Sequence, residues 1–148
     1  KILIEALEKT KISQFICDNQ HKKWTTSVEF DADHRRFCST IIEFLDQHLE
    51  EAIPTYGRAA KLLNVYLKGM LVIGAETSDW MVNIHPPIDR ILLQNLRRMK
   101  GIDPEAKKHC NEAWTGYSEE EYFRTIRFVK KICGDKGLWT IEENWKAG

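Results

Sequence analysis

Apolar residues recur along most of this chain at the spacing of amphipathic helices. The clearest stretch has apolar side chains three or four positions apart, at Phe37, Cys38, Ile41, Ile42, Leu45 and Leu49. This spacing places them on one face of a helix, and such a face has to be covered by another element. Strand-like alternation is scarce, with short candidates only at 24–30 and 71–73. The pattern therefore predicts an all-α fold, a compact bundle of six to eight short helices.

Prolines, glycines and capping residues divide this pattern into separate helices. A polar loop is expected over 19–26, a tight turn at Pro54 and Gly57, and a connecting loop over 74–83. In the first half, the predicted helices are 3–16 with a break near 9–11, a second helix capped by Asp31, and a third over 58–72. In the second half, one helix is started by Pro86–Pro87 and stopped by Gly101, a short one is started by Asp103–Pro104, and one is started by the Ser118–Glu121 capping box. A last turn or two is expected over 138–145.

The bulk properties are those of one ordinary globular domain. The 148 residues are 43% hydrophobic and 30% charged, which suits a single domain over 1–148 with its own core. The longest apolar run, Gly69 to Ala75, is far too short to cross a membrane, and the charged first residues do not read as a signal peptide. The chain begins at Lys1 and not at Met, as a chain trimmed at its N-terminus does. We expect a monomer.

The four cysteines are scattered, at Cys17, Cys38, Cys110 and Cys133. Their spacing fits neither a zinc site nor an iron–sulfur cluster, so no metal is expected. Each falls on a predicted helix face, which indicates reduced core thiols in a cytoplasmic protein, with a disulfide pair as the less favoured alternative. No nucleotide cofactor is implied.

Charge is unevenly distributed although the net charge is zero. Residues 57–100 carry 7 basic and 3 acidic residues, a net charge of +4, whereas 1–56 carry −3 and 101–148 carry −1. A local excess of this size is enough for a surface that faces phosphates. Chance clustering explains the same numbers equally well.

Two residues in this basic segment could act together in chemistry. Lys61 lies near the predicted start of one helix, and a neutral lysine amine can attack an electrophilic carbon. Asp89 lies in the first turn of the next helix, where a carboxylate stays ionised and can stabilise developing positive charge on a sugar. Taken singly, a lysine such as Lys61 is more often a solvated helix residue, and an aspartate such as Asp89 more often only stabilises the start of its helix.

The order of these signals resembles the helix-hairpin-helix DNA glycosylase superfamily. Ile53-Pro54-Thr55-Tyr56-Gly57 is similar to the family's hairpin, Lys61-Leu62-Leu63-Asn64 to its nucleophile segment K-T-A-N, and Pro87-Ile88-Asp89 to its P-V-D segment. The resemblance covers about 45 residues strongly and the remainder only in class. The interval of 28 positions from Lys61 to Asp89 is long for the family and places the chain closest to the archaeal 8-oxoguanine DNA glycosylase branch.

The resemblance implies base-excision chemistry on double-stranded DNA. Lys61 would attack C1′ of a flipped nucleotide that carries an oxidised or otherwise modified base, and a Schiff base would form. Asp89 would stabilise the oxocarbenium-like sugar, and β-elimination would add an AP lyase activity to the glycosylase. The chain departs from the family in two ways. Thr55 stands where the hairpin has glycine, and Lys61 follows Gly57 by four positions where the family lysine follows by two. Aligned without this shift, the lysine position is Ala59, and the protein would be monofunctional, would use Lys68 or would be inactive.

Further residues receive roles from the same resemblance. Backbone amides at Tyr56, Gly57 and Arg58 would grip a DNA phosphate, with Lys68 nearby. His85 before the prolines is a candidate polar contact in the base pocket. Aromatic walls for the extruded base would come from the following candidates, of which Trp80 and Trp139 are preferred, although core packing explains each of them too: Trp80, Trp114, Tyr117, Trp139 and Trp145.

Two other functions fit the same sequence. The first is a DNA-binding module that kept a hairpin fold and has no catalysis, which would bind DNA without cleaving it. The second is a helical protein-interaction module, for which zero net charge is natural and which would show no salt-dependent affinity for DNA.

Overall fold

The computed structural model describes residues 1–145, and side chains as far as Glu143, and the predicted all-α fold is confirmed. No strand occurs in this range, so the strand candidates at 24–30 and 71–73 were wrong. The α-helices are Ile2–Lys9 (α1), Ile12–Cys17 (α2), Ser27–His48 (α3), Tyr56–Leu67 (α4), Arg90–Arg98 (α5), Pro104–His109 (α6) and Glu119–Cys133 (α7). Shorter turns are Gln20–Lys23 (η1), the π-helical Lys68–Val72 (η2), Asp79–Asn83 (η3), Trp114–Gly116 (η4) and Leu138–Trp145 (η5).

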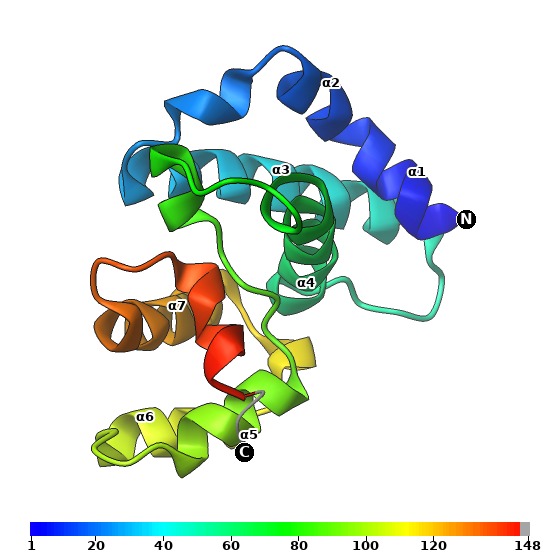
Figure 1. The fold of residues 1–148 in the computed structure, drawn as a ribbon. Coiled ribbons are helices and arrows are strands. Elements are labelled where there is room, and N and C mark those ends of the chain that lie inside the picture. The colour runs from blue at the N-terminus through cyan, green and yellow to red at the C-terminus, as the bar shows by residue number, and fades with distance from the viewer. Residues whose placement is uncertain (146–148) are drawn as a thin grey trace.

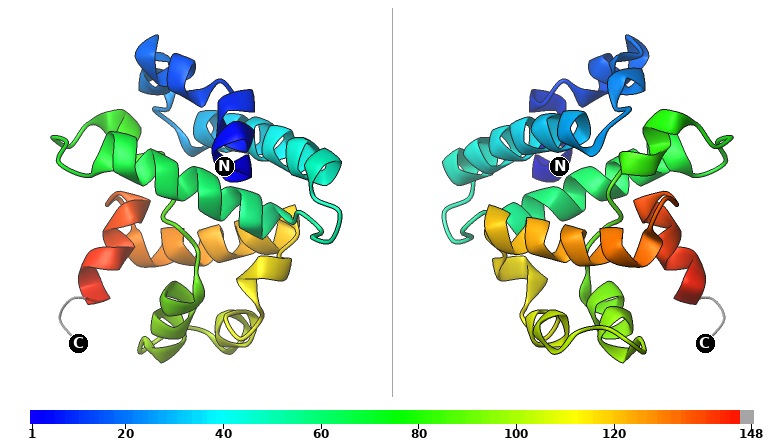
Figure 2. Two further views of the ribbon diagram at one scale, coloured as in Figure 1. Left: turned by 90° about the vertical axis from the view of Figure 1, so that its right-hand side faces the viewer. Right: turned by 90° about the vertical axis from the view of Figure 1, so that its left-hand side faces the viewer.

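The helices are stacked in tiers. At one end α1 and α2 lie against α3, which crosses α4, and α5 and α6 form the opposite end (Figure 1). Between the two ends α4 lies over α7, and η5 packs back onto α7 (Figure 2). Buried apolar side chains from Ala6 to Ile141 form one contiguous core. None of the helices in the described part of the chain is both long and apolar enough to cross a bilayer.

Local capping signals set most of the helix starts. The Ser118–Glu121 capping box begins α7 and Asp103 caps α6, both as predicted. The prediction that Asp31 caps the second helix was wrong, because a capping box earlier in the chain begins α3. There, Glu29 N donates to Thr26 Oγ1 over 3.4 Å, and Thr26 N donates to the Glu29 carboxylate over 2.7 Å. Asp31 therefore lies inside α3.

Pro86 and Pro87 do not start a helix, contrary to the prediction. They belong to the segment 84–88, which is entirely buried and carries the chain from the upper tiers down to α5 (Figure 1). An extended segment in a core leaves backbone donors without partners, and a proline has no N–H that needs one. The two prolines thus suit a buried crossing better than a helix start, and α5 begins only at Arg90.

Asn64 on α4 is the centre of a buried hydrogen-bond network. Its Nδ2 donates to Pro86 O over 3.1 Å and to Tyr122 Oη over 2.8 Å. Its Oδ1 lies 3.0 Å from His34 Nε2. The three partners belong to the segment 84–88, α7 and α3, so one amide side chain ties together four parts of the fold. Loss of any partner would leave buried polar atoms unpaired.

The network continues through two histidines to a carboxylate. His85 Nδ1 lies 2.8 Å from Tyr122 Oη, and its Nε2 lies 3.0 Å from Asp31 Oδ1. Tyr56 Oη lies 3.0 Å from His34 Nδ1. One arrangement of protons satisfies every contact: Tyr56 and Tyr122 donate to Nδ1, and both rings are neutral and donate from Nε2.

The pKa shifts agree with this arrangement of protons. Burial lowers the pKa of His85 and lowers the pKa of His34 well below its ordinary value. Burial alone would raise the pKa of Asp31, but the hydrogen bond from His85 and the neighbouring charges, including Lys130, lower it overall. The core therefore contains two neutral histidines beside an ionised carboxylate.

The prediction that the four cysteines are core thiols is confirmed for only some of them. All four cysteines are free; Cys38 and Cys110 are buried and Cys133 is half-buried, but Cys17 is exposed at the end of α2. Burial raises the pKa of the Cys110 thiol to about 11, so this group stays protonated near neutral pH.

The buried histidines predict that acid destabilises the fold. An unfolded histidine takes up a proton near pH 6.5, whereas the folded His34 and His85 do so only at lower pH. The unfolded state then binds more protons, so the free energy of unfolding falls as the pH drops below about 6.5, by up to about 1.4 kcal/mol per pH unit for each histidine. Urea denaturation between neutral pH and pH 5 measures the slope. His85→Gln should show a shallower slope than the wild type, and a flat wild-type profile would contradict neutral buried histidines.

Candidate functional site

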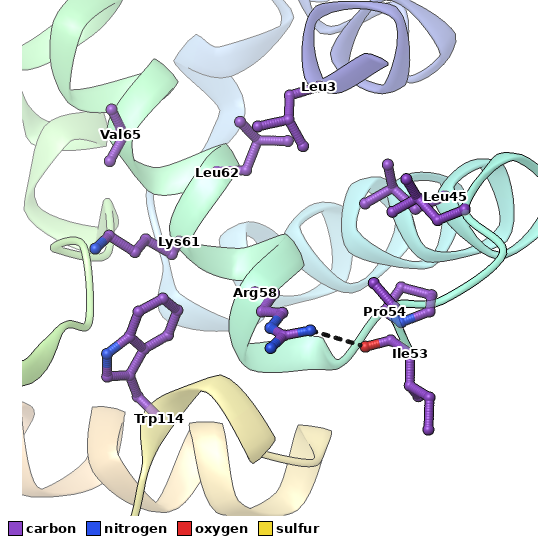
Figure 3. Close-up of a pocket in the computed structure, with 11 residues that line it drawn as sticks. Leu3, Leu45, Ile53, Pro54, Arg58, Lys61, Leu62, Val65 and Trp114 are labelled. Carbon is purple, nitrogen blue, oxygen red and sulfur yellow. Dashed lines mark hydrogen bonds between the residues drawn. The ribbon is translucent and has the colours of Figure 1, made fainter.

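Lys61 lies on the exposed side of α4 and packs on an aromatic ring. Thr55 caps this helix by accepting a hydrogen bond from Arg58 N. The helix therefore begins at Tyr56, before the predicted start at 58. The buried face of α4 carries small and apolar residues, which turns Lys61 outward and leaves it half-buried. Its ammonium lies 4.5 Å from the centroid of the Trp114 ring, a cation–π contact (Figure 3).

An apolar pocket of about 390 Å³ lies beside this lysine. The end of α3, the segment 49–55, α4, Leu3 of α1 and Trp114 form its walls (Figure 3). Arg58 and Lys61 are the charged residues among its lining residues. Neither cation forms an ion pair with a carboxylate in the described part of the chain.

Asp89 is the N-cap of α5 and is half-buried. Its Oδ1 accepts a hydrogen bond from Leu92 N over 2.9 Å, and Oδ2 makes no hydrogen bond or ion pair to any described residue. Asp89 follows Pro86 by three positions, and Lys61 precedes Asn64 by one helical turn. The Asn64–Pro86 hydrogen bond therefore joins the element that carries Lys61 to the element that carries Asp89.

A second pocket of about 410 Å³ adjoins the start of α5. Trp114 lines both pockets, so the same indole separates them. The second pocket is polar, and the side chains that could bind a ligand there are Arg90, Gln94, Arg97, Asn111 and Glu112. An aromatic wall with amide and guanidinium groups around it suits a planar ligand with hydrogen-bonding edges.

The predicted phosphate-binding hairpin is not seen at Tyr56, Gly57 and Arg58. The amide of Gly57 donates to Tyr117 O over 3.1 Å, and the amide of Arg58 donates to the Thr55 cap over 3.3 Å. The Tyr56 side chain is buried and its hydroxyl bonds to His34. The amides of Gly57 and Arg58 thus have acceptors inside the protein, and the Arg58 side chain is exposed.

Apart from Arg58 and Trp114, the predicted site residues, Asp89 included, do not line the pocket beside Lys61. Lys68 pairs with Glu142 of η5. His85 is part of the core network, with 1% of its surface exposed. Trp80 packs edge-on against His21, with ring centroids 4.6 Å apart, and Trp139 lies over the buried Gly137. None of these four lines the pocket beside Lys61, and the Trp145 side chain lies outside the described residues.

Two residues matter more in the structure than in the sequence. Asn64 appeared only as the last letter of the lysine segment, and its role depends on partners 22, 30 and 58 positions away, which no local pattern reveals. Trp114 was one of several aromatic candidates. Its distinguishing feature, a place between two pockets, depends on the packing of η4 against α4.

The packing of Gly57 against η4 gives a testable prediction. A Cβ at position 57 would overlap the carbonyl oxygen of Trp114, whereas a Cβ at Gly69 would meet nothing within 4 Å. Gly57→Ala should therefore lower the free energy of unfolding by about 1–3 kcal/mol, and Gly69→Ala should not lower it appreciably. Equal stability of the two variants in urea denaturation would contradict the close contact.

The cap at Asp89 can be separated from its charge. Asp89→Ala removes the acceptor for Leu92 N and should lower the free energy of unfolding by about 1 kcal/mol. Asp89→Asn retains an oxygen at the cap and should change the free energy of unfolding by only about a few tenths of a kcal/mol. Thermal unfolding of both variants checks the difference, and equal losses would show that the hydrogen bond is not what matters. Asp89→Asn is then a tool for testing the negative charge alone.

Comparison of the chain with protein-family models, curated proteins and solved structures finds no match. A functional conclusion therefore rests on the residues and contacts of the chain itself and on the resemblance of its 53–89 segment.

Proposed function

We propose that this protein is a DNA glycosylase that removes an oxidised or otherwise modified base, with Lys61 as nucleophile and Asp89 as its assisting carboxylate. The observation that carries the proposal is the hydrogen bond from Asn64 to Pro86, which joins the two elements that bear these residues. Lys61 is half-buried on Trp114, and Asp89 keeps one oxygen without a hydrogen-bond partner in the described chain. An amine, once deprotonated, and a carboxylate on two joined elements suit attack on a sugar carbon.

The chemistry follows from these two groups. The deprotonated Lys61 amine attacks C1′, and the bond from C1′ to the base breaks with its electron pair leaving on the base, which takes a proton. Asp89 stabilises positive charge on the sugar during this step. The sugar ring then opens to a protonated imine between Lys61 and C1′, and β-elimination of the 3′ phosphate would cut the strand. The substrate is modified double-stranded DNA, and the enzyme acts as a monomer.

The polar pocket offers a place for the extruded base. A base has to leave the helix stack before its glycosidic bond can be attacked, and it is then held by stacking and by contacts to its edges. Trp114 supports stacking and Gln94 supports edge contacts, whereas the Asn111 amide is already hydrogen-bonded to Arg97 and to Lys107 O. The proposal requires that the base removed be a modified one, and the trapping experiment below identifies which modified base it is.

Borohydride trapping tests the proposal directly. The protein is incubated with duplex oligonucleotides that carry 8-oxoguanine, uracil or a bulky modified cytosine, and borohydride reduces any imine to a stable amine. We expect a covalent protein–DNA band with one of these substrates. Lys61→Arg keeps a cation beside Trp114 but forms no imine, so the band should disappear; Lys22→Arg, at an exposed lysine of η1, is the matched control.

The remaining outcomes separate the alternatives. Asp89→Asn should lower the rate of base release by about 10²-fold or more at unchanged folding, because it removes only a charge. Base release without a trapped band would make the protein a monofunctional glycosylase. No release from any substrate, together with no shift on DNA at low salt, would overturn the proposal.

A non-catalytic interaction module is the second candidate. The observation that favours it is the apolar pocket beside Lys61, together with the internal use of the Gly57 and Arg58 amides. A module of this kind would keep its fold and its binding when Lys61 is changed to Arg.

A further inference from the structure

The seam between α1 and α4 leaves an unusual amount of apolar surface open to solvent. The exposed side chains at the apolar pocket are Leu3 at 50%, Ile53 at 80% and Val65 at 52%. Scattered apolar residues are normal on a surface, but these three line one hollow. Figure 3 shows Leu3, Leu62 and Val65 on two different helices around it.

A second hollow continues the same seam. Ile4 of α1 and Tyr66 of α4 also line a second pocket, of about 470 Å³, with the apolar Leu7 and Ile12 and with the polar or charged side chains Glu8, Lys11, Ser13 and Gln14. Neighbouring residues of α1 and of α4 thus border both hollows, and we call the two together the α1–α4 groove. An elongated apolar groove is the surface that an amphipathic helix of a partner occupies.

The charge of the groove is one-sided at its Trp114 end. Arg58 and Lys61 lie there, and neither has a carboxylate partner in the described chain. Arg58 donates to Ile53 O over 3.3 Å, and the Lys61 ammonium lies over the Trp114 ring (Figure 3). Two cations at the end of an apolar surface complement carboxylates on an apolar ligand.

We propose that the α1–α4 groove binds an amphipathic helix of a partner protein, with acidic side chains at the end that meets Arg58 and Lys61. The open form of the groove favours a helix over a small molecule, which a pocket usually encloses on most sides. This inference depends on the groove alone and not on the glycosylase chemistry.

A displayed library of helical peptides of about 15 residues tests the proposal. Apolar residues are fixed at i, i+3, i+4 and i+7, and the other positions vary among Ala, Gln, Glu and Lys. The wild-type protein should enrich peptides with Glu at one end. The double variant Arg58→Glu/Lys61→Glu should enrich peptides with Lys at that end, since the apolar lining is unchanged. Enrichment without a charge preference, or no enrichment, would overturn the proposal.

Two matched valine variants locate the site. Val65→Asp places a charge in the groove and should weaken the best peptide by about tenfold or more, while Val28→Asp, at an exposed valine outside the groove, should not. Peptide enrichment by the wild-type protein is measured without DNA, and borohydride trapping is measured without peptide, so failure here and failure of the glycosylase proposal are distinguishable. A wild-type dimer that Val65→Asp abolishes in sedimentation would assign the groove to a second copy of the chain and overturn the proposal.

Discussion

The fold depends on one buried amide. Asn64 has few ways to satisfy its donors and acceptor inside a core, and it uses them to join α3, α7 and the crossing segment 84–88 to α4. Apolar packing alone would allow these helices to slide or rotate by small amounts, whereas a hydrogen bond tolerates little change in distance or angle. The network therefore fixes the relative position of elements that are far apart in sequence.

The two candidate catalytic residues lie at the ends of this constraint. Lys61 is one turn from Asn64 and Asp89 is three residues from Pro86, so this contact joins the two stretches of chain that carry them. Chemistry between a nucleophile and an assisting carboxylate requires that both be held in place before substrate binds. The same network also makes the fold sensitive to protons, because two of its members are neutral histidines beside an ionised carboxylate.

Local signals in the sequence predicted part of the local structure, although the Thr26–Glu29 capping box was missed in favour of Asp31. The caps at Asp103 and Ser118 involve residues three positions apart, so they can be read directly from the chain. Features that depend on distant partners were missed: Pro86 and Pro87 resemble a helix start until the core around them is known. The candidate site divides in the same way, since Lys61 and Asp89 were proposed from a motif, whereas the hydrogen bond of Asn64 to Pro86 and the two pockets that Trp114 lines arise only on folding.

The position of Trp114 has a further consequence for regulation. A single indole forms a wall of both the apolar pocket and the polar pocket, and an occupant that shifts the ring on one side alters the shape of the other. Thermodynamic linkage then requires the effect to be mutual: whatever one occupant does to the affinity for the second, the second does to the affinity for the first. Ligands bound in both pockets would therefore be coupled through a single side chain.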